Sequence, residues 1–151
     1  FKNAPHRLES IATIKGVEFI NDSKATNVDS VVYALGSYDQ PIIWVAGGQD
    51  KGNDYNLIKE EVKRKVKTLI CLGKDNTKLK AFFEGLVPKV LETQNVKSLV
   101  KMAQENSKPG DVVLLSPACA SFDLFKNYMD RGDQFREAVL QLKEEKENVN
   151  V

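Results

Sequence analysis

Short runs of apolar residues recur along the chain, and segments with a different hydrophobic spacing separate them. The runs at 42–46, 69–72 and 112–115 are continuously apolar rather than alternating. This pattern is typical of parallel strands that are covered on both faces of a sheet. The sequence therefore predicts five strands, at Val17–Asn21, Ile42–Ala46, Thr68–Leu72, Lys89–Leu91 and Val112–Ser116.

Between these strands, apolar residues fall at positions i, i+3, i+4 and i+7, which is the spacing of an amphipathic helix. Val28, Val31, Val32 and Leu35 are one such set. Equivalent spacing predicts a helix in each of the later gaps and another after the last strand. The predicted helices span about 28–35, 56–65, 79–86, 96–103 and 130–145.

Strands and helices alternate throughout the chain after Asp22. Such alternation indicates βαβ units with right-handed crossovers, and hence a three-layer α/β fold with a mostly parallel, doubly wound, Rossmann-like sheet. Residues 10–14, just before Gly16, predict an antiparallel strand at one edge of that sheet. Helix N-caps are expected at Asp54, Asp75, Asn95 and Asp130.

Length and composition restrict the class of protein. The 151 residues suit a single domain spanning 1–151, with a frayed tail at 144–151. Because 22 Lys and Arg balance 21 Asp and Glu, the net charge of +1 indicates neither a nucleic-acid nor a membrane partner. No apolar run approaches the roughly 18 residues of a membrane span. Since the chain starts with Phe1, we expect it to be part of a longer or processed protein.

Cys71 and Cys119 lie in segments that need no disulfide, which favours a reducing, cytoplasmic environment. Cys119 could be a nucleophile or a small buried residue, and no second histidine is present to activate it. His6 and the two cysteines have no zinc-site spacing, so we expect no metal site.

Ligands of open α/β sheets bind beyond the carboxyl ends of the strands, so the loops after the strands are the candidate site. The loop at 21–27 runs into a helix whose free N–H groups, together with Lys24 and the Thr26 hydroxyl, would receive an anion. Asp22 is suited to accept hydrogen bonds from a ribose diol or an amine. Alternatively, Thr26 or Asn27 simply caps the helix and Lys24 is solvated.

The loop at 47–54 has three glycines around an Asp-Lys pair, so the backbone can approach a ligand and Lys51 can bind a carboxylate or phosphate. It matches neither a P-loop nor a dinucleotide fingerprint. The alternative is a turn with positive φ angles and a solvated Lys51. The loop at 116–123 is rich in small residues, including Ser121, whose exposed backbone amides could hold a carboxylate. Arg7 could pair with a phosphate.

These loops, at 21–27, 47–54 and 116–125, resemble the C-terminal domain of the Mur ligases. His6-Arg7-Leu8-Glu9, Lys126-Asn127-Tyr128 and Arg131-Gly132 carry the same resemblance. Within that family they are similar to the branch that adds D-glutamate. The resemblance covers about Pro5 to Leu142. It implies a three-domain, monomeric, cytoplasmic enzyme of peptidoglycan synthesis.

In such an enzyme ATP phosphorylates the carboxylate of UDP-N-acetylmuramoyl-L-alanine, and the amine of D-glutamate attacks the acyl phosphate. The resemblance implies that Arg7 reaches the ATP phosphates and Asp22 the ribose. It also implies that the D-glutamate carboxylates are held by Lys24, Thr26, Lys51, Ser121 and the backbone at Tyr128. The P-loop and the Mg²⁺ ligands would belong to the central domain, so this domain alone is expected to be inactive.

Two other functions fit the pattern of elements. One is a stand-alone module that binds a nucleotide or an acidic amino acid without chemistry. The other is a receiver-like phosphoacceptor domain, which would need an acidic cluster and a lysine after the last strand. Ser116-Pro117 occupies that last place, which disfavours the receiver.

Overall fold

The computed structural model describes residues 4–148. Its strands are β1 (Glu9–Ile14), β2 (Val17–Asn21), β3 (Ile42–Ala46), β4 (Val66–Leu72), β5 (Lys89–Thr93) and β6 (Val112–Leu115). Its helices are α1 (Val28–Gly36), the short 3₁₀ helix η1 (Tyr55–Leu57), α2 (Lys59–Lys65), α3 (Thr77–Phe83), α4 (Val96–Glu105) and α5 (Tyr128–Asn148).

All six strands form one sheet in the order β1-β2-β6-β3-β4-β5. β1 pairs with β2 antiparallel, and every other pair is parallel. The predicted mostly parallel sheet with an antiparallel N-terminal edge strand is therefore confirmed. Because β6 lies between β2 and β3, the carboxyl ends of these three strands are adjacent, although they are far apart in sequence.

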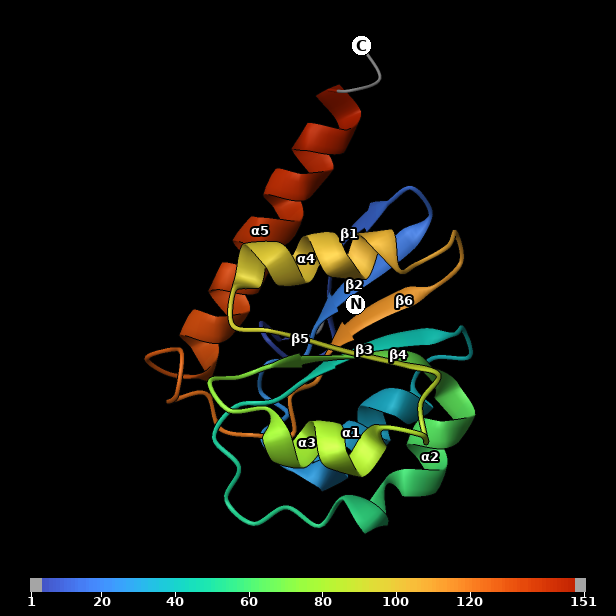
Figure 1. Cartoon of the computed structure of the whole chain (residues 1–151). Helices are drawn as coiled ribbons and strands as arrows, with labels where there is room; N and C mark the ends of the chain where they lie inside the picture. The colour runs from blue at the N-terminus through green and yellow to red at the C-terminus, as the bar shows by residue number, and fades with distance from the viewer. Residues whose placement is uncertain (1–3, 149–151) are drawn as a thin grey trace.

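Helices cover both faces of the sheet (Figure 1), with α1, α2 and α3 on one face and α4 and α5 on the other. Alternate residues of β3 supply the two cores. Trp44 belongs to the core under α1 and α3, whereas Ile43 and Val45 belong to the core under α4 and α5. The three-layer architecture is thus confirmed, and the double coverage explains why β3 is continuously apolar.

Two of the predicted helices differ in detail from the structure. The helix expected at 56–65 is divided into η1 and α2 at Ile58, because Tyr55 and Ile58 are both buried in the core. Asp130 does not cap the last helix, which begins at Tyr128. Instead, Asn127 Oδ1 accepts a hydrogen bond from Asp130 N at 2.8 Å.

The other expected caps are largely as predicted. Asp54 and Asn95 accept backbone N–H groups at the starts of η1 and α4. Asp75 accepts from Thr77 N at 3.0 Å, although Asn76 is the residue that immediately precedes α3. α5 continues through Asn148, and the rest of the expected tail, 149–151, lies outside the described residues. Within residues 4–148, no helix is both long enough and apolar enough to span a bilayer.

Candidate functional site

The loops that follow β2, β3 and β6 meet at one edge of the sheet, and backbone hydrogen bonds join them. Ala120 and Gln49 exchange two such bonds, of 2.8 and 3.2 Å, which tie the loop after β6 to the loop after β3. The loop after β2 is held in the same way. The other joining bonds are Asp22 N to Leu115 O at 2.8 Å, Ala118 N to Ala25 O at 2.9 Å and Gly47 N to Pro117 O at 3.0 Å.

Two open cavities flank the loop after β2. The first, which we call cavity 1, has a volume of about 320 Å³. It brings together Arg7, Asp22 and Lys24, of which the first two are the predicted ATP-binding residues. Lys24 therefore lies with these two rather than with the other residues predicted to bind D-glutamate. The remaining lining residues are Leu8, Ala25, Ser30 and Tyr33.

Asp22 is the buried acid of cavity 1, with only 5% of its surface exposed. Its Oδ1 accepts a hydrogen bond from Leu8 N at 3.1 Å, and its Oδ2 accepts one from Ser116 Oγ at 2.9 Å. Burial raises the pKa of this carboxyl from 3.8 to about 6, against the opposing effects of these two hydrogen bonds and of Arg7. At neutral pH the carboxylate is therefore charged and rigidly placed, and it can accept hydrogen bonds from a ligand.

Tyr33, which was not among the predicted site residues, lines cavity 1 with 73% of its surface exposed. It stands outside the inward set Val28, Val31, Val32 and Leu35 of its helix. An aromatic residue on the polar side of an amphipathic helix that follows a candidate loop is the signal that could have found it. The ring offers a flat apolar surface beside two cations and a carboxylate.

The second cavity, cavity 2, has a volume of about 310 Å³. It brings together Thr26, Lys51, Ser121 and Tyr128, the other four residues predicted to bind D-glutamate. Lys51 supplies an ammonium group, and none of the lining residues carries a carboxylate. The remaining lining residues are Gln49, Asn53, Ala118, Cys119, Ala120, Phe122 and Asn127. Cavity 2 therefore favours an anionic ligand.

The glycine-rich loop after β3 needs its glycines for two reasons. Gly47 and Gly48 have φ angles of 126° and 136°, which L side chains rarely adopt. In addition, a Cβ atom on Gly48 would overlap the carbonyl oxygen of Ala120. Lys51 is exposed at the tip of this loop, and its Nζ lies 6.0 Å from the centroid of the Phe122 ring. The predicted positive-φ turn is present, and Lys51 remains accessible to a ligand.

The start of α1 is capped by Asn27, whose Oδ1 accepts from Ser30 N at 2.9 Å. Of the two caps considered from the sequence, Asn27 is therefore the one the structure uses. Thr26 is exposed and lines cavity 2.

Cys119 lines cavity 2 but is only 2% exposed, and burial raises the pKa of its thiol. Its Sγ lies 3.5 Å from Tyr55 Oη. The hydrogen bond with Tyr55 lowers the pKa of the thiol, but burial has the larger effect and favours the neutral form. Burial therefore supports the interpretation of Cys119 as a small buried residue. Cys71 is buried in β4, and neither cysteine forms a disulfide. In the part of the chain that the structure describes, no three His, Cys, Asp or Glu residues gather as a metal site.

Arg131 is part of the family resemblance, but no role was predicted for it from the sequence. It projects from α5 and is 1% exposed, and its guanidinium donates to Ser23 Oγ at 2.9 Å, Ser23 O at 2.8 Å and Cys119 O at 3.0 Å. Ser23 Oγ in turn donates to Tyr128 O at 2.7 Å. Arg131 thus connects α5 to the loops after β2 and β6. Its spacing from the inward Phe135, Ala138 and Leu142 is the signal that could have found it.

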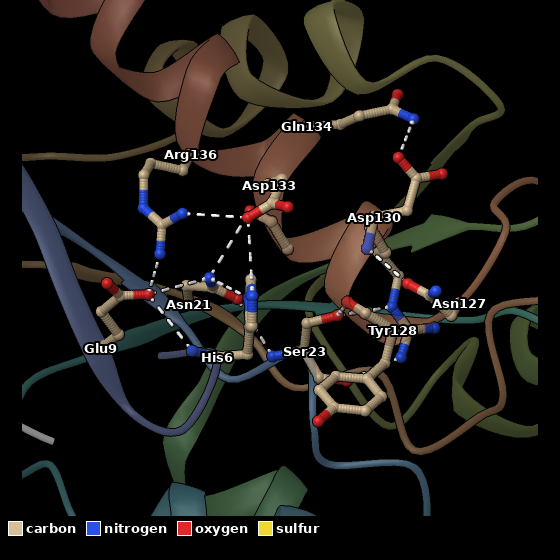
Figure 2. Close-up of polar contacts among 12 residues, drawn as sticks. His6, Glu9, Asn21, Ser23, Asn127, Tyr128, Asp130, Asp133, Gln134 and Arg136 are labelled. Carbon is tan, nitrogen blue, oxygen red and sulfur yellow. Dashed lines mark hydrogen bonds and ion pairs between the residues drawn. The ribbon is translucent and has the colours of Figure 1, made fainter. Parts of the chain in front are cut away.

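A second polar network fixes the segment that carries Arg7 (Figure 2). His6 Nδ1 lies 3.0 Å from Asn21 Nδ2, and His6 Nε2 lies 3.5 Å from Asp133 Oδ1 on α5. Asn21 Nδ2 also donates to Glu9 Oε1 at 3.2 Å, and Arg136 pairs with Glu9. Because these contacts hold His6 against β2 and α5, the neighbouring Arg7 is placed at cavity 1.

Known proteins resemble this chain in sequence and in fold. The sequence profile of the family described as "Mur ligase, glutamate ligase domain" matches residues 6–119. A UDP-N-acetylmuramoylalanine–D-glutamate ligase from Cytophaga hutchinsonii is 56% identical over 142 residues, which are 94% of this chain and 32% of that protein. The enzyme of the same name from Porphyromonas gingivalis has the same identity and coverage. The chain therefore spans about a third of the length of these curated relatives.

Solved structures share the fold at low sequence identity. The MurF ligase of Thermotoga maritima, solved with ADP, has a TM-score of 0.55 at 16% sequence identity. The match covers 100% of this chain and 33% of the MurF chain. The murein peptide ligase of Psychrobacter arcticus has a TM-score of 0.62 at 10% identity, over 90% of this chain and 29% of its own.

Proposed function

The chain belongs to the Mur ligase family, matching its glutamate ligase domain, and on this premise we propose that it is the C-terminal, amino-acid-binding domain of a UDP-N-acetylmuramoylalanine–D-glutamate ligase. The observation that carries the proposal is cavity 2, which gathers Thr26, Lys51, Ser121 and Tyr128 around a space with no carboxylate in its lining. This is the arrangement that a dianionic amino acid requires.

In this proposal cavity 2 binds D-glutamate. The Lys51 ammonium would bind one carboxylate, and the Thr26 and Ser121 hydroxyls and the backbone at Tyr128 would donate to the carboxylate oxygens. No acidic group of the cavity 2 lining would stabilise the protonated amine. The amine can therefore be held neutral, with its lone pair free to attack an electrophile.

Cavity 1 would bind ATP. Its apolar surface, formed by Leu8 and the exposed Tyr33, suits the base, and the Asp22 carboxylate can accept the ribose hydroxyls. The two cations of the same cavity, Arg7 and Lys24, suit the phosphates. We therefore propose that Lys24 serves the nucleotide phosphates as well as, or instead of, the amino acid, because it lines cavity 1 and not cavity 2.

The proposed reaction joins the two ligands. ATP transfers its γ-phosphoryl group to the carboxylate of UDP-N-acetylmuramoyl-L-alanine, which releases ADP. The D-glutamate amine then attacks the acyl carbon, so that an amide forms and phosphate leaves. Residues 4–148 supply no cluster of three metal-ligating side chains, so the Mg²⁺ that accompanies ATP would be held mainly by other parts of a longer ligase.

The UDP-linked substrate would also be bound outside this domain. We therefore expect this domain to be inactive when isolated, and the full ligase to act as a monomer in the cytoplasm, in peptidoglycan synthesis. Closure of the domain over the activated substrate would bring the amine to the acyl phosphate and exclude water.

Substitutions in the full-length ligase test this assignment. Lys51→Ala is expected to raise KM for D-glutamate by about tenfold or more, because it removes a charge-assisted hydrogen bond, while KM for ATP stays within about twofold. Arg7→Ala is expected to raise KM for ATP instead. Steady-state phosphate release measures both constants, and Lys63→Ala, on the exposed face of α2, is the control.

If Lys51→Ala left the D-glutamate kinetics unchanged, the assignment of cavity 2 would be wrong. If the full-length protein bound both ligands but released no phosphate with the UDP-linked substrate present, the stand-alone binding module would be the better description.

A further inference from the structure

We propose that Asp50 is a positioning residue, whose carboxylate folds the loop after β3 so that the neighbouring Lys51 is presented to cavity 2. The inference rests on the proposed function, because it assumes that Lys51 binds the amino-acid substrate. Asp50 itself lines neither cavity, and in the proposed function it contacts neither ligand.

The Asp50 carboxylate accepts four hydrogen bonds from its surroundings. Its Oδ1 accepts from Gly52 N at 2.8 Å and from Asn53 N at 2.9 Å, which closes a tight turn around Lys51. Its Oδ2 accepts from the hydroxyl of the buried Tyr55 at 2.8 Å. Because one carboxylate binds the backbone on the far side of Lys51 and a residue fixed in the core, the tip of the loop has little freedom to move.

Lys78, on α3, completes this cluster. Its Nζ lies 3.1 Å from Asp50 Oδ1 and donates to Asn53 O at 2.8 Å. The same ammonium lies 5.3 Å from the centroid of the Tyr55 ring. The negative charge of Asp50 is therefore neutralised by a lysine of α3, which leaves the ammonium of Lys51 available to a ligand.

The ionised form of Asp50 is the one these contacts favour. Burial alone would raise its pKa, but the hydrogen bonds from Asn53 N, Tyr55 Oη and Gly52 N, and that from Lys78, lower the pKa overall. The Asp50 carboxylate therefore stays charged throughout the neutral pH range.

The turn also fixes the wall of cavity 2. Asn53, which follows the turn, donates from Nδ2 to Ala118 O at 2.8 Å. Ala118 has a φ angle of 64°, so this part of the loop after β6 is held in a conformation that an alanine rarely adopts. Asp50 thus sets the relative positions of Lys51 and of the loop that carries Ser121, and both belong to the proposed carboxylate site.

Steady-state kinetics of the full-length ligase separate positioning from simple stabilisation. Asp50→Ala is expected to raise KM for D-glutamate by about fivefold to twentyfold while KM for ATP stays within about twofold, because only the presentation of Lys51 is lost. Asp50→Asn keeps an acceptor for Gly52 N and Asn53 N and should restore KM to within about threefold of the wild type. Lys78→Met should give an intermediate rise.

Asp75→Ala is the matched control, since Asp75 also accepts a backbone N–H in a turn but lies before α3 and outside both cavities. It is expected to leave KM for D-glutamate unchanged. If Asp50→Ala does not fold, the test uses the other two variants. KM for D-glutamate should then increase from the wild type to Asp50→Asn to Lys78→Met.

Two results would overturn the inference while the proposed function stands. One is an unchanged KM for D-glutamate in Asp50→Ala and Lys78→Met, measured beside a raised KM in Lys51→Ala. The other is a fall in kcat alone, with both KM values unchanged, as expected of a smaller fraction of folded enzyme. An unchanged KM in Lys51→Ala would instead remove the proposed function, and with it this inference.

Discussion

Asp22 shows how a residue that is proposed to bind a ligand can lower the stability of the fold. The side chain is 5% exposed, and its burial raises its pKa from 3.8 in an unfolded chain to about 6 in the fold. Between these two values the folded state binds more protons than the unfolded state. The free energy of unfolding contributed by Asp22 therefore falls as pH rises through this window. A shift of this size corresponds to at most about 3 kcal/mol at neutral pH.

Asp22→Asn is expected to be more stable than the wild type at pH 7.5, by about 1–3 kcal/mol, and to lose this advantage near pH 4. The amide keeps an acceptor for Leu8 N and can donate to Ser116 Oγ, without a charge to bury. Urea denaturation at the two pH values measures the difference. Asp29→Asn, in the first turn of α1, controls for the loss of a surface charge.

If the stability advantage of Asp22→Asn were equal at both pH values, the proposed link between the pKa of Asp22 and the free energy of unfolding would be wrong.

The same variant should bind ADP more weakly, since the neutral amide is a poorer acceptor for ribose hydroxyls. Stability and binding would then change in opposite directions at one residue, as is common at functional sites.

At the scale of the elements, Arg131 decides how α5 is joined to the site. Burial lowers the pKa of its guanidinium to about 10, so the group remains charged at neutral pH. It donates to the hydroxyl and carbonyl of Ser23 and to the carbonyl of Cys119. α5 therefore holds two site loops through a single side chain.

Arg131→Gln is expected to lower the free energy of unfolding by about 3 kcal/mol or more, because it leaves buried acceptors without donors. For a chain of this size the melting temperature would fall by about 6–12 °C. Thermal denaturation followed by circular dichroism measures the shift. Arg64→Gln, which removes an exposed ion pair with Glu61 on α2, should change stability by less than about 0.5 kcal/mol. Equal effects of the two substitutions would show that the Arg131 contacts contribute little.

The order of elements was predictable because each depends on local periodicity. Continuous apolar runs located β3, β4 and β6, and helical spacing located α1 and α4. The division of the 56–65 helix at Ile58 was not predictable, because it follows from the packing of Tyr55 and Ile58 into the same core. Nor was the role of Asp130, since a helix start depends on which of several polar residues the tertiary structure leaves free to cap it.

The site was predictable only in part, for a related reason. Strand ends and residue chemistry identified the three loops, because parallel strands place their carboxyl ends at one edge. The separation of Lys24 from Thr26 into different cavities could not be derived from their adjacency in sequence. Arg131 acts through contacts with the loops after β2 and β6, and Asp50 combines contacts within its own turn with an ion pair to Lys78 on α3. The partners on other elements could not be derived from a single sequence.

At the scale of the whole molecule, a net charge of +1 conceals an uneven distribution of charge. The cations Arg7, Lys24 and Lys51 gather at the edge where three strands end, with Asp22 as the carboxylate in the linings of the two cavities. No residue lines both cavities, although the segment 22–27 runs between them. In the proposed function, the domain would hold two anionic ligands side by side at this edge.

This arrangement predicts two separate sets of responses when the isotope-labelled chain is titrated in NMR experiments. ADP should shift the amide signals around Arg7, Asp22 and Tyr33, and D-glutamate those around Lys51, Ser121 and Tyr128. Lys24 and Thr26, on the shared segment, should respond to both. L-glutamate should cause smaller shifts, because its amine and carboxylates cannot occupy the same three positions. Equal responses to the two enantiomers, or one common set for ADP and D-glutamate, would contradict a preformed amino-acid site distinct from the nucleotide site.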